Sequence, residues 1–323
     1  MSIVTAPLPW QQDQWRGLME LLASGRLPHA LMLAGPSETG KSAFAEILAQ
    51  RLLCEVPDEL GYPCGQCKNC QLFRSGSHPD YYRLNPDEQG KAIRIDHVRE
   101  LGAFANKTAS LGGWRTVVVN PAEAMNTSAA NAFLKTLEEP GSDTLIILVC
   151  HRPSAVLPTI RSRCRSLTFP LPDREALRAW LSARESGRTP DPDIVALAGG
   201  KPLRALRFLE SDLLDQYRHF EGILEQLANR QSTPLEAARQ MQSLPEGDAI
   251  DWFQQRLYAI IRERQTLQAL ETRRFFRLLD RLNRARSLLQ STANPNRQLL
   301  WEEVLLDWMS VVNLRPGTAP RRR

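Results

Sequence analysis

The stretch GPSETGKS, residues 35–42, matches the phosphate-loop pattern G-x-x-x-x-G-K-[ST] at every defined position. It directly follows the apolar run ALMLA, residues 30–34, and directly precedes a helix-like run at residues 42–53. Phosphate loops occur in this context, where a buried strand turns into the amino terminus of a helix. The stretch therefore predicts a phosphate site at the edge of a sheet. A glycine-rich turn that binds nothing is the simpler alternative.

Four residues of this stretch are candidate ligands for a nucleotide. Gly35 and Gly40 let backbone N–H groups approach phosphate, and the helix dipole adds to the attraction. Lys41 can reach the β and γ phosphate oxygens, and Ser42 can ligate Mg²⁺. The expected ligand is ATP or ADP with Mg²⁺, and the pattern leaves the occupancy of the site open.

Strand-like apolar runs alternate with helix-like stretches over residues 31–169. The runs are ALMLAG, RTVVVN, TLIILVC and SLTFPL. Because they are apolar at consecutive positions, both faces of each strand should be buried. This pattern predicts an α/β domain with a mostly parallel sheet and helices on both faces. From Asp173 onward the strand pattern ends and helical spacing continues to about Val312.

Composition and charge limit the class of protein. The chain has 323 residues, of which 42% are hydrophobic, and this is enough for two or three cores. No stretch approaches the roughly 20 apolar residues of a membrane helix, and the first residues lack the pattern of an export signal. We therefore expect a cytoplasmic protein without membrane association. The net charge of +5 is compatible with a polyanionic partner but does not require one.

The run that should carry the acidic residues of an ATPase ends without them. ATP hydrolysis at a phosphate loop needs a carboxylate at the end of a neighbouring strand to organise Mg²⁺, often with a second one beside it. The candidate strand, residues 115–119, is followed by Asn120 and Pro121. Glu123 is the nearest carboxylate, and its place beyond the strand end should direct it elsewhere. The absence of a general base alone lowers the rate by a factor of about 10² to 10⁴, so we expect nucleotide binding without useful turnover.

Four cysteines form the pattern C-x9-C-x2-C-x2-C in a polar segment after the predicted helix. They are Cys54, Cys64, Cys67 and Cys70. Four thiolates at this spacing satisfy tetrahedral Zn²⁺, and they leave no open position for catalysis. The pattern predicts a structural zinc site, and a redox role of the C-x2-C pairs is the alternative. Cys150 and Cys164 stand apart, and core packing is the simpler reading for Cys150.

Together these segments resemble the delta-prime clamp-loader subunits of bacterial DNA polymerase III, which belong to the AAA+ family. The similar segments also include HPDYYRL at 78–84, IRIDHVREL at 93–101, NAFLKTLEEP at 131–140, LPTIRSRC at 157–164 and GGKPLRAL at 199–206. The resemblance implies an AAA+ domain at 1–168 with a zinc insert at about 54–70, and a helical lid at 169–210. A helical collar at 211–314 and a disordered tail at 315–323 would follow.

The resemblance also implies partners and roles for two arginines. The partners are delta and gamma/tau subunits in a pentameric complex, the sliding clamp, and primed DNA held by the complex. Arg163 matches the arginine finger, which acts in trans on the γ-phosphate of a neighbouring gamma/tau subunit, and Arg204 matches the lid arginine that senses nucleotide in cis. The first sensor position, usually Thr or Asn, falls on Cys150 or His151. The implied role is a non-hydrolysing stator.

Two other functions remain as alternatives. One is an active, gamma-like P-loop ATPase subunit in which Glu123 or a distant acid replaces the missing pair. The other is a zinc-dependent nucleic-acid-binding protein that uses the arginine-rich segment at residues 273–284. A solvated helix face is the simpler reading of that segment, because no exposed aromatic residues are expected among its arginines.

Overall fold

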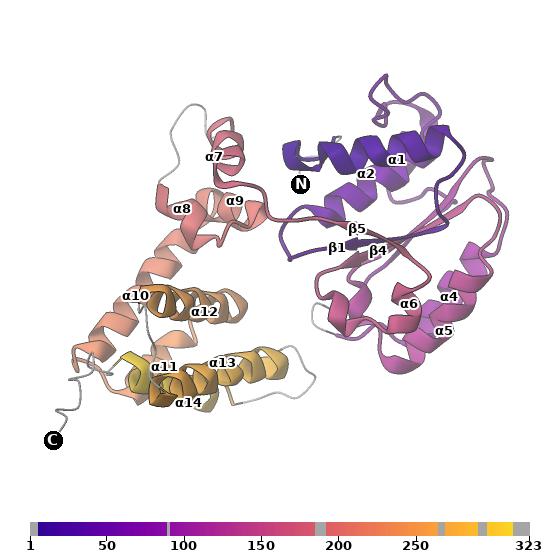
Figure 1. Ribbon diagram of the computed structural model, residues 1–323. Helices are drawn as coiled ribbons and strands as arrows, with labels where there is room; N and C mark the ends of the chain where they lie inside the picture. Colours follow the sequence, from indigo (N-terminus) through magenta and orange to yellow (C-terminus); the bar gives the residue numbers. More distant parts are fainter. Residues whose placement is uncertain (1–5, 89–90, 185–191, 264–268, 290–295, 313–323) are drawn as a thin grey trace. The chain divides into compact units, whose positions relative to one another are not determined.

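The computed structural model describes residues 6–88, 91–184, 192–263, 269–289 and 296–312. The chain forms two compact units, Met1–Ala205 and Leu206–Arg323 (Figure 1). The predicted tail at 315–323 lies outside the described residues. Among the described residues, none of the helices combines the length and the apolar character needed to span a bilayer.

The first unit contains a five-stranded sheet. Its strands are β1 (Ala30–Ala34), β2 (Tyr81–Leu84), β3 (Arg115–Val119), β4 (Thr144–Cys150) and β5 (Arg165–Thr168), in the order β2-β3-β4-β1-β5. Every pairing between these strands is parallel, which confirms the predicted α/β fold. The apolar-run pattern does not predict β2, because only Leu84 of this edge strand is buried.

Helices cover both faces of the sheet, as predicted (Figure 1). They are α1 (Gln12–Ala23), α2 (Lys41–Leu53), α4 (Ile95–Ala105), α5 (Thr127–Glu138) and the short α6 (Pro158–Arg161). Alternate residues of each strand point to opposite faces, so Leu31 and Leu33 pack with Phe44 of α2 while Met32 joins the cluster that contains Phe133 of α5. The sheet core therefore fixes the positions of the loops at the carboxyl ends of its strands.

Strands β1, β3 and β4 are buried at every position, as their apolar runs predict. The same expectation is wrong for β5, where Arg165, Ser166 and Thr168 are exposed. The physical reason is its place at the edge of the sheet, where one side of the strand has no neighbour.

A buried ion pair anchors the start of β3. Arg115 and Asp80 are joined at 2.8 Å, and their side chains are 3% and 0% exposed. Asp80 also accepts the backbone N–H groups of Ser110 at 2.7 Å and Leu111 at 2.9 Å. Arg115 donates to the carbonyl of Phe104 at 3.0 Å. Each charge is thus compensated, as burial requires.

Replacing Asp80 with alanine should destabilise the first unit by about 3–5 kcal/mol, because Arg115 would remain buried without its carboxylate. Urea unfolding measures the change. The matched control is Asp87→Ala, which breaks the exposed pair with Arg94 and should cost no more than about 1 kcal/mol. Equal losses in the two variants would contradict the structural role of the buried pair.

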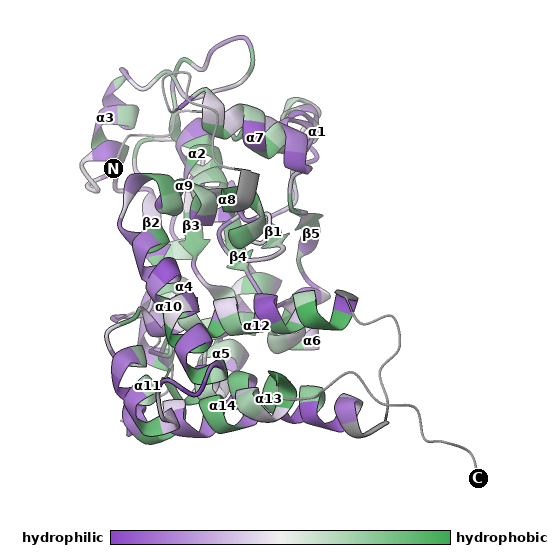
Figure 2. Ribbon diagram, turned by 90° about the vertical axis from the view of Figure 1, so that its left-hand side faces the viewer, coloured by the Kyte–Doolittle hydropathy of each residue, from purple (hydrophilic) through white to green (hydrophobic). Residues whose placement is uncertain are grey.

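The chain after the sheet is helical, as the sequence pattern predicts. The helices are α7 (Arg174–Ser182), α8 (Pro192–Leu197), α9 (Pro202–Glu210), α10 (Leu213–Ala228), α11 (Pro234–Met241), α12 (Glu246–Glu263), α13 (Ala269–Leu289) and α14 (Arg297–Val312). The division between the two units falls inside α9. Hydrophilic and hydrophobic bands alternate along α13 (Figure 2). Its residues Phe275, Leu278 and Leu282 are buried, so the helical spacing marks a packing face.

Candidate functional site

The phosphate loop joins β1 to α2 in a conformation that depends on glycine. Gly40 has a φ of 90°, in the region that side chains disfavour, and it is the residue that caps α2. A Cβ atom on Gly35 would clash with the backbone of Phe169. Gly35 therefore lets the loop lie against the backbone of Phe169, and Gly40 allows the turn that starts α2.

Lys41 is folded back onto its own loop. Its Nζ donates to the carbonyl of Gly35 at 2.8 Å and to the carbonyl of Pro36, and the residue is only 2% exposed. Burial lowers the pKa of this ammonium group to about 8, an effect that Glu123 partly offsets. The group is thus still mainly charged at neutral pH. It would have to exchange loop carbonyls for phosphate oxygens to bind a nucleotide.

The end of β3 meets the phosphate loop through an amide. Asn120 Nδ2 donates to the hydroxyl of Ser42 at 3.1 Å. Asn120 thus occupies the place beside the candidate Mg²⁺ ligand where an ATPase would carry a carboxylate. A neutral amide can neither take a proton from water nor add negative charge to a metal shell.

Glu123 points toward the end of β4. Its carboxylate accepts the backbone N–H of His151 at 3.0 Å and that of Arg152 at 3.1 Å. Burial, followed by the charge of Lys41, lowers the pKa of His151. The thiol of Cys150 is fully buried, and burial raises its pKa to about 12. The carboxylate of Glu123 therefore fixes the backbone at His151, one of the two candidates for the first sensor position.

Arg204 lies at the phosphate loop, where its counterpart is Glu38. The guanidinium and the carboxylate are 2.9 Å apart, and the side chain of Arg204 is 6% exposed. Lys201 lies 3.9 Å from the same carboxylate oxygen. The structure thus brings Arg204 together with the loop that contains Lys41 and Ser42, but through an acidic side chain of that loop.

Arg163 lies on another part of the first unit. It pairs with Glu138 of α5 at 2.5 Å and donates to the carbonyl of Thr159 in α6 at 3.0 Å. Local pairing with an acid is the simpler reading of this arginine, and the isolated chain shows such a pair. The side chains of Arg163 and Glu138 remain 37% and 50% exposed, so the guanidinium is accessible to a partner.

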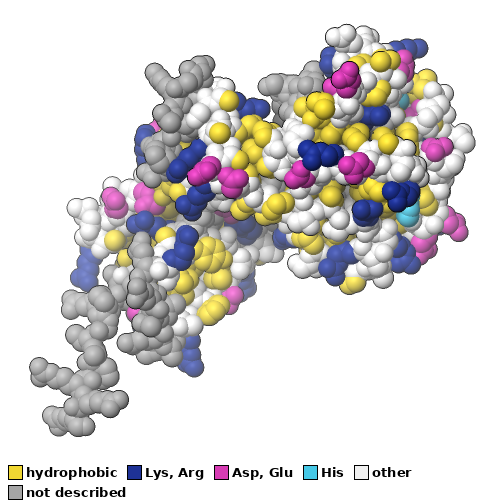
Figure 3. Space-filling model, turned by 45° about the horizontal axis from the view of Figure 1, so that its top comes forward, with side chains coloured by type: hydrophobic (Ala, Val, Ile, Leu, Met, Phe, Trp, Pro, Cys, Tyr) yellow, Lys and Arg dark blue, Asp and Glu magenta, His cyan; other side chains and the backbone are white. Residues whose placement is uncertain are grey.

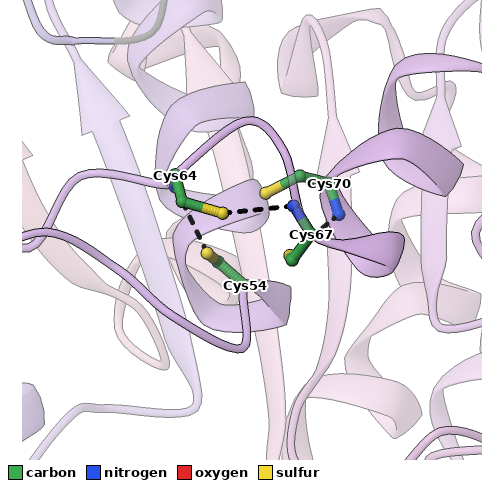
Figure 4. A group of neighbouring side chains, drawn as sticks. All are labelled: Cys54, Cys64, Cys67 and Cys70. Carbon is green, nitrogen blue, oxygen red and sulfur yellow. Dashed lines mark hydrogen bonds between the residues drawn. The ribbon is translucent and has the colours of Figure 1, made fainter.

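The four cysteines gather at one point between the end of α2 and α3 (Lys68–Arg74), as Figure 4 shows. Their sulfur atoms all lie within 4.8 Å of one another. A zinc ion with four thiolates at about 2.3 Å would set the sulfur atoms roughly 3.8 Å apart, so this donor set fits zinc after a small contraction.

Backbone groups and burial shift the pKa values of three of the four thiols in opposite directions. The N–H groups of Gln66 and Cys67 lower the pKa of Cys64 to about 6. Burial raises the pKa of Cys54, and it raises the pKa of Cys70 to about 12. Metal binding therefore has to displace protons from the buried thiols, which makes it pH-dependent.

Comparison with known proteins identifies the family. The chain is 38% identical to DNA polymerase III subunit delta′ of Pseudomonas aeruginosa, over 94% of this chain and 97% of that protein. The family model described as DNA polymerase III, delta subunit, matches residues 10–173. The chain belongs to the DNA polymerase III delta-prime family. A second model, for the carboxyl-terminal part of the delta subunit, matches residues 264–310 of this delta-prime chain.

Other relatives of the delta-prime chain agree with this assignment. It is 37% identical to DNA polymerase III subunit delta′ of Escherichia coli, over 63% of this chain and 61% of that protein. Among solved structures, it resembles a gamma subunit-related protein of DNA polymerase III from Thermotoga maritima, with a TM-score of 0.51 and 17% identity. That match covers 94% of this chain and 99% of the other, and at this identity it shows the fold alone.

The sequence pattern alone does not identify Glu38 of this delta-prime chain as a functional residue. Its backbone has a φ of 63°, which is uncommon for a residue with a side chain. An acidic residue between the glycines of a phosphate loop was the available signal, because it puts negative charge where a phosphate would bind. Its partner Arg204 lies far away in the sequence, so the pair itself could not be foreseen.

Proposed function

We propose that this delta-prime chain is a non-hydrolysing stator subunit of a bacterial clamp loader. It assembles with delta and gamma/tau subunits into a pentamer that places the sliding clamp on primed DNA. The observation that carries the proposal is the contact of Asn120 with Ser42, because it puts an amide beside the candidate magnesium ligand. The proposed partners follow from the membership of this chain in the DNA polymerase III delta-prime family.

Under this proposal, none of the residues that the structure describes supplies a base to the phosphate loop. Asn120 cannot deprotonate water, and the carboxylate of Glu123 is held by the backbone of His151 and Arg152. Loss of a general base alone lowers a rate by about 10² to 10⁴. A nucleotide held by Lys41 would therefore have a structural role, and hydrolysis would belong to a neighbouring subunit.

Arg163 is the residue that acts on that neighbour. An arginine that reaches the γ-phosphate in trans stabilises the charge that develops during phosphoryl transfer. The pair of Arg163 with Glu138 is exposed, and exposed pairs contribute only about 0–1 kcal/mol. The guanidinium can therefore exchange Glu138 for a phosphate at little cost.

The cysteine cluster would hold a structural zinc ion. Cys54, Cys64, Cys67 and Cys70 supply four thiolates, and this set leaves no position for a reacting water. The ion would fix the insert between α2 and α3, which has few apolar residues of its own. The proposed role of the ion is therefore to stabilise the segment between α2 and α3, together with the surface that this segment presents.

Reconstitution tests the proposed function. Native mass spectrometry of this chain mixed with delta and gamma/tau subunits should show a pentamer that contains one copy of it. The complete mixture should load the clamp onto primed DNA, and omission of this chain should abolish loading. A pentamer that forms and loads equally well without this chain would contradict the proposal.

The nucleic-acid-binding alternative receives limited support. The expectation that α13 has no exposed aromatic among its arginines is wrong, because Phe276 is 61% exposed. However, Arg281 pairs with Asp307 at 3.2 Å and Arg274 donates to the carbonyl of Ser310 at 3.0 Å, so these two arginines hold α14. Basic and acidic side chains are interspersed over the face shown in Figure 3. The charge distribution on this face therefore does not favour DNA binding there by the chain on its own.

A further inference from the structure

Glu38 connects the phosphate loop to α9 by both its backbone and its side chain. The carbonyl of Glu38 accepts the N–H of Leu203 at 3.1 Å. Its carboxylate lies 2.9 Å from the guanidinium of Arg204 and 3.9 Å from the ammonium of Lys201. Glu38 thus contacts three residues at the start of α9 or directly before it: Lys201, Leu203 and Arg204. Arg204 is the candidate nucleotide-sensing arginine.

The conformation of Glu38 indicates that these contacts are maintained against strain. Its φ of 63° lies in the left-handed region, which favours glycine. Residues in such regions persist only when the surrounding structure holds them there, and they cluster at ligand clamps and switches. The contacts with Leu203 and Arg204 are among the interactions that can hold Glu38 in this state.

The chemistry of the pair makes it a competitor of phosphate. A guanidinium binds carboxylate and phosphate oxygens with the same planar donor geometry. While Glu38 is paired with Arg204, a nucleotide must displace a carboxylate that is already in place, and it must approach that negative charge. Lys41 is likewise satisfied by carbonyls of the loop. Both cations are therefore compensated without any nucleotide.

We propose that Glu38 is an internal anion that takes the place of a nucleotide phosphate on Arg204 and so weakens nucleotide binding to this chain. The phosphate loop and the start of α9 are then held together when no nucleotide is bound. This inference deepens the proposed stator role, since it explains how an intact phosphate loop can serve a subunit that does not depend on ATP.

Calorimetric titration of the full chain with ATP and Mg²⁺ tests the inference. Glu38→Gln removes the charge and keeps the size, and it should tighten binding by about tenfold, the effect expected for one hydrogen bond to a charged group. Glu38→Gly removes the carboxylate altogether at a positive φ that glycine accepts, and it should tighten binding as well. Glu175→Gln on α7 is the matched control, because it removes an exposed carboxylate that lies outside the phosphate-loop sequence and should leave affinity unchanged.

A double-mutant cycle separates competition for Arg204 from simple charge repulsion. If Glu38 acts by occupying Arg204, then Glu38→Gln should give a much smaller gain in an Arg204→Gln background than in the natural chain. Equal gains in both backgrounds, or no gain from either Glu38 variant, would overturn the inference. The titration uses the isolated chain, so its failure leaves the proposed action of Arg163 on a neighbour untouched, and the reverse also holds.

Discussion

Replacing Arg163 with alanine is expected to leave the clamp-loader complex assembled while lowering its DNA-stimulated ATPase activity. An arginine finger contributes a factor of about 10³ to 10⁵ at the site on which it acts. The ATPase site that receives Arg163 should therefore lose nearly all of its activity. Sites that receive an arginine from another subunit should keep theirs. The measurement is the steady-state ATPase rate of the reconstituted complex with primed DNA and the clamp.

The surroundings of Arg163 supply matched controls. Arg161 is an exposed arginine two positions earlier, and Arg161→Ala should leave the rate unchanged. Glu138→Gln removes the local partner of Arg163, and it should not lower the rate because it only frees the guanidinium. Should Arg163→Ala give the natural rate in a complex of natural composition, the assignment of the arginine finger is wrong.

The second large effect is expected at the proposed zinc site. Replacing Cys64 with serine should abolish the proposed zinc binding and destabilise the segment between α2 and α3, because zinc ligation contributes about 10–16 kcal/mol in small zinc-dependent modules. Cys64 is only partly buried, so lost packing is a minor part of the change. The measurements are zinc content by mass spectrometry of metals and thermal unfolding of the purified chain.

Cys164 provides the control for this experiment. It is buried outside the cluster, so Cys164→Ala should keep one zinc per chain even if it lowers stability through lost packing. Zinc affinity of the natural chain should weaken as the pH falls, since protons compete for the thiolates. A natural chain that is purified without zinc and gains no stability when zinc is added would contradict a structural metal site.

The parts of this protein that were predictable from sequence are those set by short-range patterns. The phosphate loop is defined by residues that are adjacent in the chain, and the position of Asn120 follows from the end of one apolar run. The four cysteines lie within one segment, so their spacing indicates their proximity. In each case a local rule determines the geometry.

The remaining features depend on contacts between distant segments. The edge positions of β2 and β5 follow from the strand order, which apolar runs alone do not specify. The pair of Glu38 with Arg204 joins the phosphate loop to α9, and the pair of Arg163 with Glu138 joins the segment after α6 to α5. Such partners are selected by the three-dimensional fold, so only the structure reveals them.

The most direct test of the stator account is the ATPase activity of the isolated chain with Mg²⁺. Because Asn120 stands beside Ser42 where a carboxylate is needed, the natural chain should turn over no faster than a Lys41→Ala variant. Turnover in the range of ordinary enzymes, about 1–10³ s⁻¹, that disappears in the Lys41→Ala variant would show that the chain hydrolyses ATP itself and would contradict the account.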